Sequence, residues 1–224
     1  MMDEHIQADE LKSWDNEAQA LDDNVRHLVA ISAMASANRT SSIASVARRR
    51  LDQLVQTSEK AVFIQQSREA ILKMSCLMGT PKSINALTSL MSLVGSDSDL
   101  AQELAKVPAL RSQENYSYNK MRARGQDLFD GIYGRHAVTV EGKLRGLYPD
   151  LAEVVIIDCY GRLLGETRYL DGRDTELCAI GSLVPQDVPS QLKSHCLGAA
   201  RMGATEDMVQ AALRLAKLIC TKRP

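Results

Sequence analysis

The 224-residue sequence predicts an all-α fold, and three observations lead to this prediction. Apolar residues recur at spacings of three and four through most of the chain, as they do on one face of a helix. Alanine, leucine, methionine and serine are abundant beside only two phenylalanines and one tryptophan, a balance that favours helices packed through aliphatic side chains. The one strand-like segment, VVII at 154–157, has no second strand to pair with, so we expect it to be helical as well.

The boundaries of the helices follow from capping and turn residues. Asp22 and Asp23 are placed to cap the helix that follows them, and Gly79 with Pro81 ends another in the usual order of glycine before proline. We expect 56–60 to be a loop, whereas 138–147 fits either a helix or an irregular connection. The expected helices are 3–20, 22–37, 43–54, 61–78, 84–94, 116–133, 151–164, two within 170–205, and 208–219.

The polar, turn-rich run 95–99 is the strongest candidate for a linker. We therefore expect an N-terminal polar helix over 1–21, a first helical unit over 22–95, a linker over 96–115 and a second unit over 116–224.

Composition and charge exclude several classes of protein. The net charge of −1 argues against nucleic acid as a partner, and no apolar run is long enough to cross a membrane. The acidic N-terminus does not resemble a secretory signal, and the last residues, TKRP, match no peroxisomal signal. Five widely spaced cysteines without a Cys-x-x-Cys are typical of reduced thiols. These features predict a cytoplasmic protein without a cofactor, a metal site or a glycine-rich phosphate loop.

The stretch 170–205 carries the only plausible chemistry in the sequence. Glu176 lies near the start of its first helix, and His195 lies on the apolar side of the second. A carboxylate that accepts a ring N–H would orient the imidazole and raise its basicity, which suits proton transfer near pH 7. The alternatives are that His195 is a hydrogen-bonded core residue and that Glu176 only complements the helix dipole.

The same helix pair occurs twice in the chain. A shift that places Leu21 on Leu170 aligns 21–51 with 170–200 without a gap, and it matches identical aspartate, leucine, alanine, isoleucine and serine residues. This alignment indicates an internal duplication, although chance similarity between two alanine-rich helix pairs is the alternative. Because His27 stands opposite Glu176 and Val46 opposite His195, a duplication would leave one active centre per chain.

In the second half, TELCAIGSLV, QLKSH and GAARMGATEDMVQAAL resemble the carboxymuconolactone decarboxylase family, which includes the alkyl hydroperoxidase D-like proteins. Three further motifs resemble the segment that precedes this core in the family: GQDLFDGIYG, LYPDL and YGRLLGE. The first half of the chain resembles the same core and its tail at LVAISAMASAN and REAILKMSCLMGTPKSINAL. The resemblance covers 22–95 and 116–220. It implies an antiparallel helical bundle of the alkyl hydroperoxidase D-like type, with two repeats of which the first is degenerate, assembled as a homotrimer or homohexamer.

The chain departs from the hydroperoxidase branch at one important place. Those members carry Cys-x-x-Cys before the histidine, and here the two positions are Val188 and Gln191. Without these two thiols that reduction cycle cannot run. The resemblance then implies the decarboxylase branch, in which acid–base chemistry by His195 and Glu176 would act on a small carboxylated lactone.

Arg162, Arg168 and Arg173 precede the core and could hold a substrate carboxylate, although solvated surface charge is the alternative for each. Cys178 and Cys196 are better explained as buried packing than as nucleophiles, because adjacent helical residues such as His195 and Cys196 do not share a face. The sequence does not decide whether the chain is an enzyme. The hypotheses are a lactone decarboxylase or isomerase, a non-catalytic module for assembly or partner binding, and a thiol peroxidase that uses Cys178 or Cys196.

Overall fold

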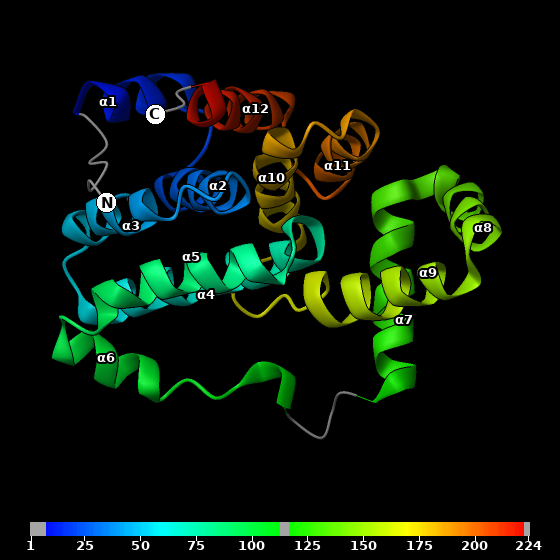
Figure 1. The fold of residues 1–224 in the computed structure, drawn as a ribbon, viewed down its shortest axis with the longest axis horizontal. Helices are drawn as coiled ribbons and strands as arrows, with labels where there is room; N and C mark the ends of the chain where they lie inside the picture. Colours follow the sequence, from blue (N-terminus) through cyan, green and yellow to red (C-terminus); the bar gives the residue numbers. More distant parts are fainter. Residues whose placement is uncertain (1–7, 113–116, 222–224) are drawn as a thin grey trace.

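The computed structural model describes residues 8–112 and 117–221, and all regular structure in them is helical. The all-α prediction is therefore confirmed for this part of the chain (Figure 1). None of these helices combines the length and the apolar character that a membrane span requires.

Two helices that are far apart in the sequence form the centre of the fold. These are α2 (Asp23–Ser36) and α10 (Gly172–Leu183), and almost every residue of both is buried. They approach closely at Gly181, where an added Cβ would lie 2.8 Å from the backbone oxygen of Val29. The hydroxyl of Ser36 also donates to the carbonyl of Ser182 over 2.6 Å. Helices that are apolar on all sides must pack against other elements on all sides, and the remaining helices of the fold surround this pair.

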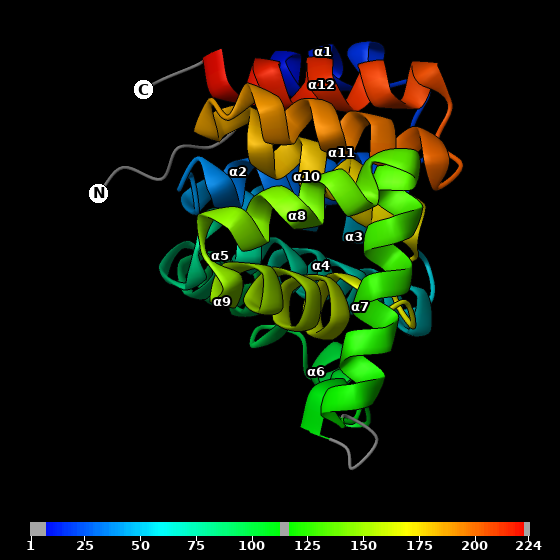
Figure 2. The same cartoon turned by 90° about the vertical axis from the view of Figure 1, so that its right-hand side faces the viewer.

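The covering helices form two layers and a lateral arm. In both views α1 and α12 lie together on one side of the central pair, with α4 and α5 on the other (Figures 1 and 2). The arm consists of α7, α8, α9 and the π-helix η3, which pack beside α11. The bounds are α1 Ala8–Glu17, α3 Ser41–Gln53, α4 Thr57–Met78, α5 Thr80–Val94, α6 Ser98–Ala105, η1 Leu110–Ser112, α7 Tyr118–Tyr133, η2 Gly134–His136, α8 Ala137–Leu147, α9 Pro149–Glu153, η3 Val154–Leu164, η4 Val184–Gln186, α11 Pro189–Arg201 and α12 Glu206–Thr221.

Two glycines allow the arm to form, because α7 and η3 cross with almost no separation between their backbones. A Cβ on Gly125 would lie 2.0 Å from the carbonyl oxygen of Ile156, and one on Gly161 would lie 2.2 Å from that of Met121. Any larger residue at either position would push the two helices apart. The crossing fixes η3, which carries several residues of the site described below.

The structure differs from the sequence-based expectations in two segments, decides one that was left open and confirms one as helical. Residues 56–60 are not a loop, because α4 begins at Thr57 after a capping box formed by Gln56 and Glu59. The stretch 96–115 contains α6, which Asp97 caps. The ambiguous segment 138–147 belongs to α8, and the VVII segment is helical but in π form. Glutamine is not a common N-cap, so the start of α4 could not be recognised from its capping residue. Residues 1–7 of the expected polar helix over 1–21 lie outside the described residues.

Candidate functional site

Glu176 and His195 meet between α10 and α11. The Nδ1 atom of His195 lies 3.0 Å from Oε2 of Glu176, within hydrogen-bond distance. An ionised carboxylate only accepts hydrogen bonds, so this contact assigns the Nδ1 proton to the imidazole. The Nε2 atom then carries either a lone pair or a second proton, and no residue in the described part of the chain takes it as a partner.

The pair is buried, and a glycine makes room for it. Glu176 is 0 % exposed and His195 is 4 % exposed. Gly198 lies one turn after His195, and an added Cβ there would come 2.4 Å from Oε2 of Glu176. The second carboxylate oxygen, Oε1, has no hydrogen-bond partner among the described residues. A buried carboxylate with one unused acceptor is costly in a purely structural role, so this geometry favours a role in chemistry.

The environment shifts the pKa of His195 upwards. Burial by itself lowers the pKa, but the negative charge of Glu176 and its hydrogen bond outweigh that effect. The imidazolium form is therefore favoured more than in a free histidine. A histidine with a raised pKa and a free Nε2 can donate a proton and take it back.

His195 opens onto a pocket of about 460 Å³, a volume suited to a small organic molecule. The pocket lies between α11 on one side and α4, α7, α8 and η3 on the other. Lys143 is the only lysine, arginine, aspartate or glutamate among its lining residues. The lining residues are Cys76, Leu77, Tyr133, Val140, Lys143, Leu144, Val155, Cys159, Tyr160, Leu164, Ser190, Gln191, Ser194 and His195.

The three arginines expected near the substrate do not line this pocket. Arg168 is exposed, and Arg173 forms an ion pair with Asp174 at 2.8 Å that raises the pKa of its guanidinium. Arg162 lies in the wall of a separate pocket of about 540 Å³. The structure therefore does not bring any of the three together with His195.

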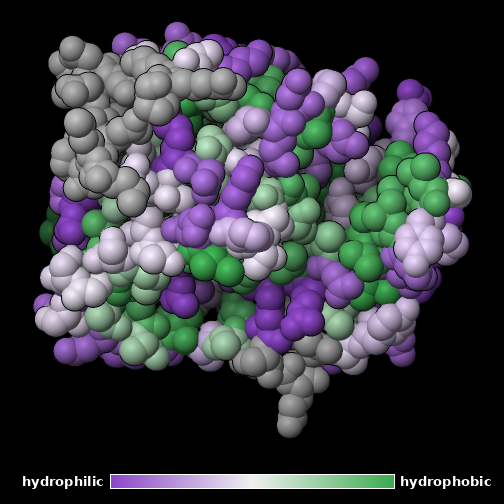
Figure 3. Space-filling view, viewed as in Figure 1, coloured by the Kyte–Doolittle hydropathy of each residue, from purple (hydrophilic) through white to green (hydrophobic). Residues whose placement is uncertain are grey.

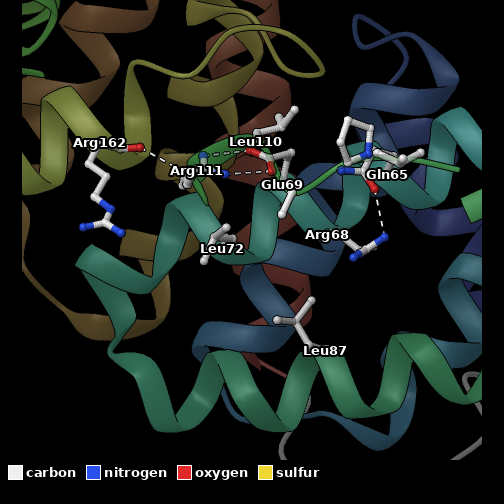
Figure 4. Close-up of a pocket in the computed structure, with 11 residues that line it drawn as sticks. Gln65, Arg68, Glu69, Leu72, Leu87, Leu110, Arg111 and Arg162 are labelled. Carbon is white, nitrogen blue, oxygen red and sulfur yellow. Dashed lines mark hydrogen bonds and ion pairs between the residues drawn. The ribbon is translucent and has the colours of Figure 1, made fainter. Parts of the chain in front are cut away.

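The separate pocket lies between α4, α5 and the segment after α6 (Figure 4). At its centre Arg111 donates from both terminal nitrogens to the two carboxylate oxygens of Glu69, at 2.9 and 2.8 Å. Arg68 and Arg162 lie at opposite ends of the row of lining side chains, and Arg68 also donates to Gln65. The central charges neutralise each other, and no nucleophile or titrating histidine is present among the lining residues.

The matching positions in the first half hold no comparable pair. His27 is buried, its Nδ1 lies 2.6 Å from the carbonyl oxygen of Asp23, and Val46 is buried. Burial and three nearby arginines lower the pKa of His27 to about 4. His27 is therefore neutral near pH 7, and the described part of the first half has no carboxylate–imidazole pair at the matching place.

Several lining residues gave no signal in the sequence. The hydroxyl of Tyr160 donates to that of Tyr133 over 3.2 Å, and both rings pack on Phe129. Cys76 and Cys159 line the same pocket although 83 positions separate them. Cys178 is fully buried, and its burial raises the pKa of the thiol to about 12. No cluster of His, Cys, Asp and Glu in the described ranges is arranged to hold a metal ion.

The chain is similar to two yeast proteins, both named peroxisomal protein 2. It is 27 % identical over 190 residues to the one from Schizosaccharomyces pombe, an alignment that covers 85 % of this chain and 83 % of that protein. It is 30 % identical over 173 residues to the one from Saccharomyces cerevisiae, covering 68 % of this chain and 59 % of that protein. No protein-family model and no solved structure matches the chain.

These relatives correct two expectations. Their name gives a peroxisomal location, which contradicts the cytoplasmic one expected from the sequence, and it gives no support to a carboxymuconolactone decarboxylase. The cytoplasmic expectation was wrong because it rested on reduced thiols and on the lack of a recognised targeting motif, and neither observation identifies a compartment. The expected lactone chemistry was wrong because it rested on short helix motifs, which report a scaffold more reliably than a reaction.

Proposed function

We propose that the chain is a peroxisomal protein with a proton-transfer site for a small organic molecule, formed by His195 and Glu176. The observation that carries this proposal is a fully buried carboxylate bonded to an imidazole whose other face opens onto a pocket of about 460 Å³. His195 exchanges the proton through Nε2, and Glu176 holds the ring and stabilises its charged form. Lys143 would receive a carboxylate of the bound molecule, in place of the arginines expected from the sequence.

The scaffold of this site supports a second part of the proposal, a relation to the alkyl hydroperoxidase D-like proteins by duplication of a helix pair. Asp22 and Asp171, which the internal alignment matches, both cap the helix that follows them. The two capped helices, α2 and α10, are the packed centre of the fold. This relation concerns the fold and carries no lactone chemistry with it.

Acylation of histidine by diethyl pyrocarbonate, mapped by mass spectrometry, tests the site. The reagent attacks neutral imidazole nitrogen, so the rate at His195 should rise with pH through its raised pKa. In Glu176→Gln the midpoint should move to lower pH, because burial then acts without the opposing charge. His27 is the internal control, since it is as little exposed as His195, is neutral at pH 8 with a pKa of about 4, and does not line this pocket. A His195 that reacts no faster than His27 at pH 8 would refute an imidazole open to the pocket.

Proton transfer itself is tested in D2O. A panel of 2-oxo and 3-oxo acids, which carry exchangeable C–H groups and a carboxylate, is incubated with the protein, and deuterium incorporation is measured by mass spectrometry. We expect the wild type to exchange at least one of these acids and His195→Asn to lose that exchange. Gly142→Ala is the control and should keep the exchange, because an added Cβ at this position meets nothing within 4 Å. Equal exchange in the wild type and in His195→Asn would exclude His195 as the proton carrier.

The location is tested by fusing a fluorescent protein to the N-terminus of the whole chain, so that the C-terminus stays free. We expect the signal to coincide with a peroxisomal marker. A diffuse signal through the cytosol would contradict this part of the proposal and leave the chemistry of His195 to its own tests.

We also propose self-association through an apolar surface on the arm, formed by Val138, Leu147, Tyr148, Leu151 and Val154. These side chains are 38–84 % exposed, and a hydrophobic surface is visible at this end of the molecule (Figure 3). Contiguous exposed apolar side chains are typical of an interface. A homotrimer or homohexamer, as the resemblance implies, would cover them. Light scattering should show the oligomer dissociating in Leu147→Asp and unchanged in Val55→Asp, whose side chain is 91 % exposed elsewhere.

A further inference from the structure

Two cysteines from distant parts of the chain meet in the wall of the His195 pocket. Cys76 lies near the end of α4, and Cys159 lies in η3. Their side chains lie close enough for each to shift the pKa of the other, and both thiols are half-buried in the pocket wall rather than sealed in the core. A disulfide can form between such neighbouring thiols where their Cα atoms lie within about 7 Å.

Cys159 lies in the π-helix η3. In this element the amide of Gly165 donates to the carbonyl of Tyr160, five residues earlier, over 2.7 Å. Both Cys159 and Tyr160 line the pocket from this π-helix. A π-helix is costly and rare outside functional sites, so its presence at this thiol is consistent with a function.

The two thiols are not equivalent. The interaction with Cys76 lowers the pKa of Cys159, while the same interaction and burial raise the pKa of Cys76. The thiol of Cys76 donates its single proton to the carbonyl oxygen of Lys73 over 3.1 Å. This bond holds the proton on Cys76, so Cys159 is the thiol that ionises first. This is the division of roles between an attacking and a resolving thiol.

The other cysteines lack this environment. Cys178 is fully buried beside Ser32, and burial raises its pKa to about 12. Burial also raises the pKa of Cys196 and of Cys220, and neither lines the pocket. All five cysteines lie in the described ranges and are reduced, so Cys76 and Cys159 are the one pair suited to exchange.

We propose that Cys159 and Cys76 form a dithiol–disulfide pair that exchanges with small disulfides entering the His195 pocket. The Cys159 thiolate attacks one sulfur of the small disulfide, the S–S bond of that molecule breaks, and its first half leaves as a thiolate that takes up a proton. Cys76 then loses its proton and attacks Sγ of Cys159, which releases the second half as a thiol. Overall, the small disulfide gains two electrons and two protons to give two thiols, and the protein dithiol is oxidised to a disulfide.

Oxidised glutathione serves as the probe, with mass mapping of each cysteine over time. In the wild type we expect a Cys76–Cys159 disulfide and release of two equivalents of glutathione thiol. Cys76→Ser should accumulate glutathione on Cys159 at least tenfold faster than on Cys196, and Cys159→Ser should form no disulfide. Cys196→Ser is the matched control, a half-buried thiol next to His195 whose loss should leave the exchange unchanged.

The proposal is overturned if Cys159 reacts no faster than Cys196, or if the wild type retains glutathione on Cys159 without forming the disulfide. Both outcomes are read on the wild type as well as on the serine variants, so a variant that fails to fold does not decide the test. This inference shares the pocket with the proton-transfer proposal but does not rest on it. The exchange should persist in His195→Asn, and the acylation of His195 should persist in Cys159→Ser.

Discussion

Gly198→Ala is the substitution that tests most directly how the fold positions the site. The added Cβ would lie 2.4 Å from Oε2 of Glu176, 2.8 Å from Cγ2 of Ile132 and 3.3 Å from Cδ of Glu176. Carbon and oxygen atoms do not approach to 2.4 Å without a bond, so the carboxylate must move. Because Oε2 is the atom that accepts the Nδ1 proton, this movement lengthens or breaks the contact with His195.

Two effects on stability oppose each other in this variant. Alanine is favoured over glycine inside a helix by about 0.5–1 kcal/mol, whereas overpacking a tight buried site costs about 1–3 kcal/mol. Displacement of the carboxylate adds the loss of a buried charge-assisted hydrogen bond, worth roughly 1.5–3 kcal/mol. We expect net destabilisation of about 2–4 kcal/mol, which for a chain of this size lowers the Tm by at least roughly 4 °C.

Nuclear magnetic resonance titration of the histidine ring protons measures the effect on the site. The pKa of His195 should fall below its wild-type value, because burial lowers it and the opposing charge has moved away. The pKa of His27 should stay near 4, since its neighbours do not change. Gly142→Ala is the matched control, and it should leave both pKa values unchanged and raise stability by about 0.5–1 kcal/mol. A Gly198→Ala protein with an unaltered His195 titration and unaltered Tm would refute the argument.

Three further predictions concern other buried groups, and each is measured by urea unfolding. The folded state lowers the pKa of His27 from 6.5 to about 4, so the wild type should lose up to about 3 kcal/mol as the pH falls between these values, a loss that His27→Gln removes. Lys73 is fully buried with a pKa near 8 instead of 10.5; wild-type stability should therefore rise by up to about 3 kcal/mol from pH 8 to 10.5, and Lys73→Met should abolish this rise. Asp171→Ala removes the cap that accepts from the amide of Asp174 over 2.8 Å and should cost about 1 kcal/mol at pH 7, whereas Asp127→Ala, at an exposed position inside α7 away from its caps, should not share that loss.

The raised pKa of His195 also gives a pH dependence with a defined sign. The folded state binds the proton more tightly than the unfolded chain, so the stabilisation by Glu176 is complete below the ordinary pKa of 6.5. It is lost as the pH rises through the higher folded-state pKa. The stability contribution of His195 therefore falls as the pH rises, whereas that of His27 falls as the pH drops. His27 is the residue that the internal alignment matches with Glu176. The two buried histidines therefore report on different pH ranges of the same unfolding curve.

Helical periodicity and capping residues were sufficient to predict most of the fold. The helix that starts after Asp22 begins where that aspartate cap indicated, and a second helix follows 170 as expected. The contact between Glu176 and His195 could also be anticipated, because both lie on the apolar faces of helices joined by a short turn. Such local patterns persist in the folded state because burial of one helix face is what stabilises it.

Only the tertiary structure decided which distant side chains share a pocket. Cys76 and Cys159 are brought together by the packing of α4 against η3, a contact that no spacing in the sequence encodes. The arginines expected at the substrate do not line the pocket of His195, whereas Lys143 of α8 does. Periodicity determines which face of each helix is buried, but the partner of that face depends on how all the helices fill space together.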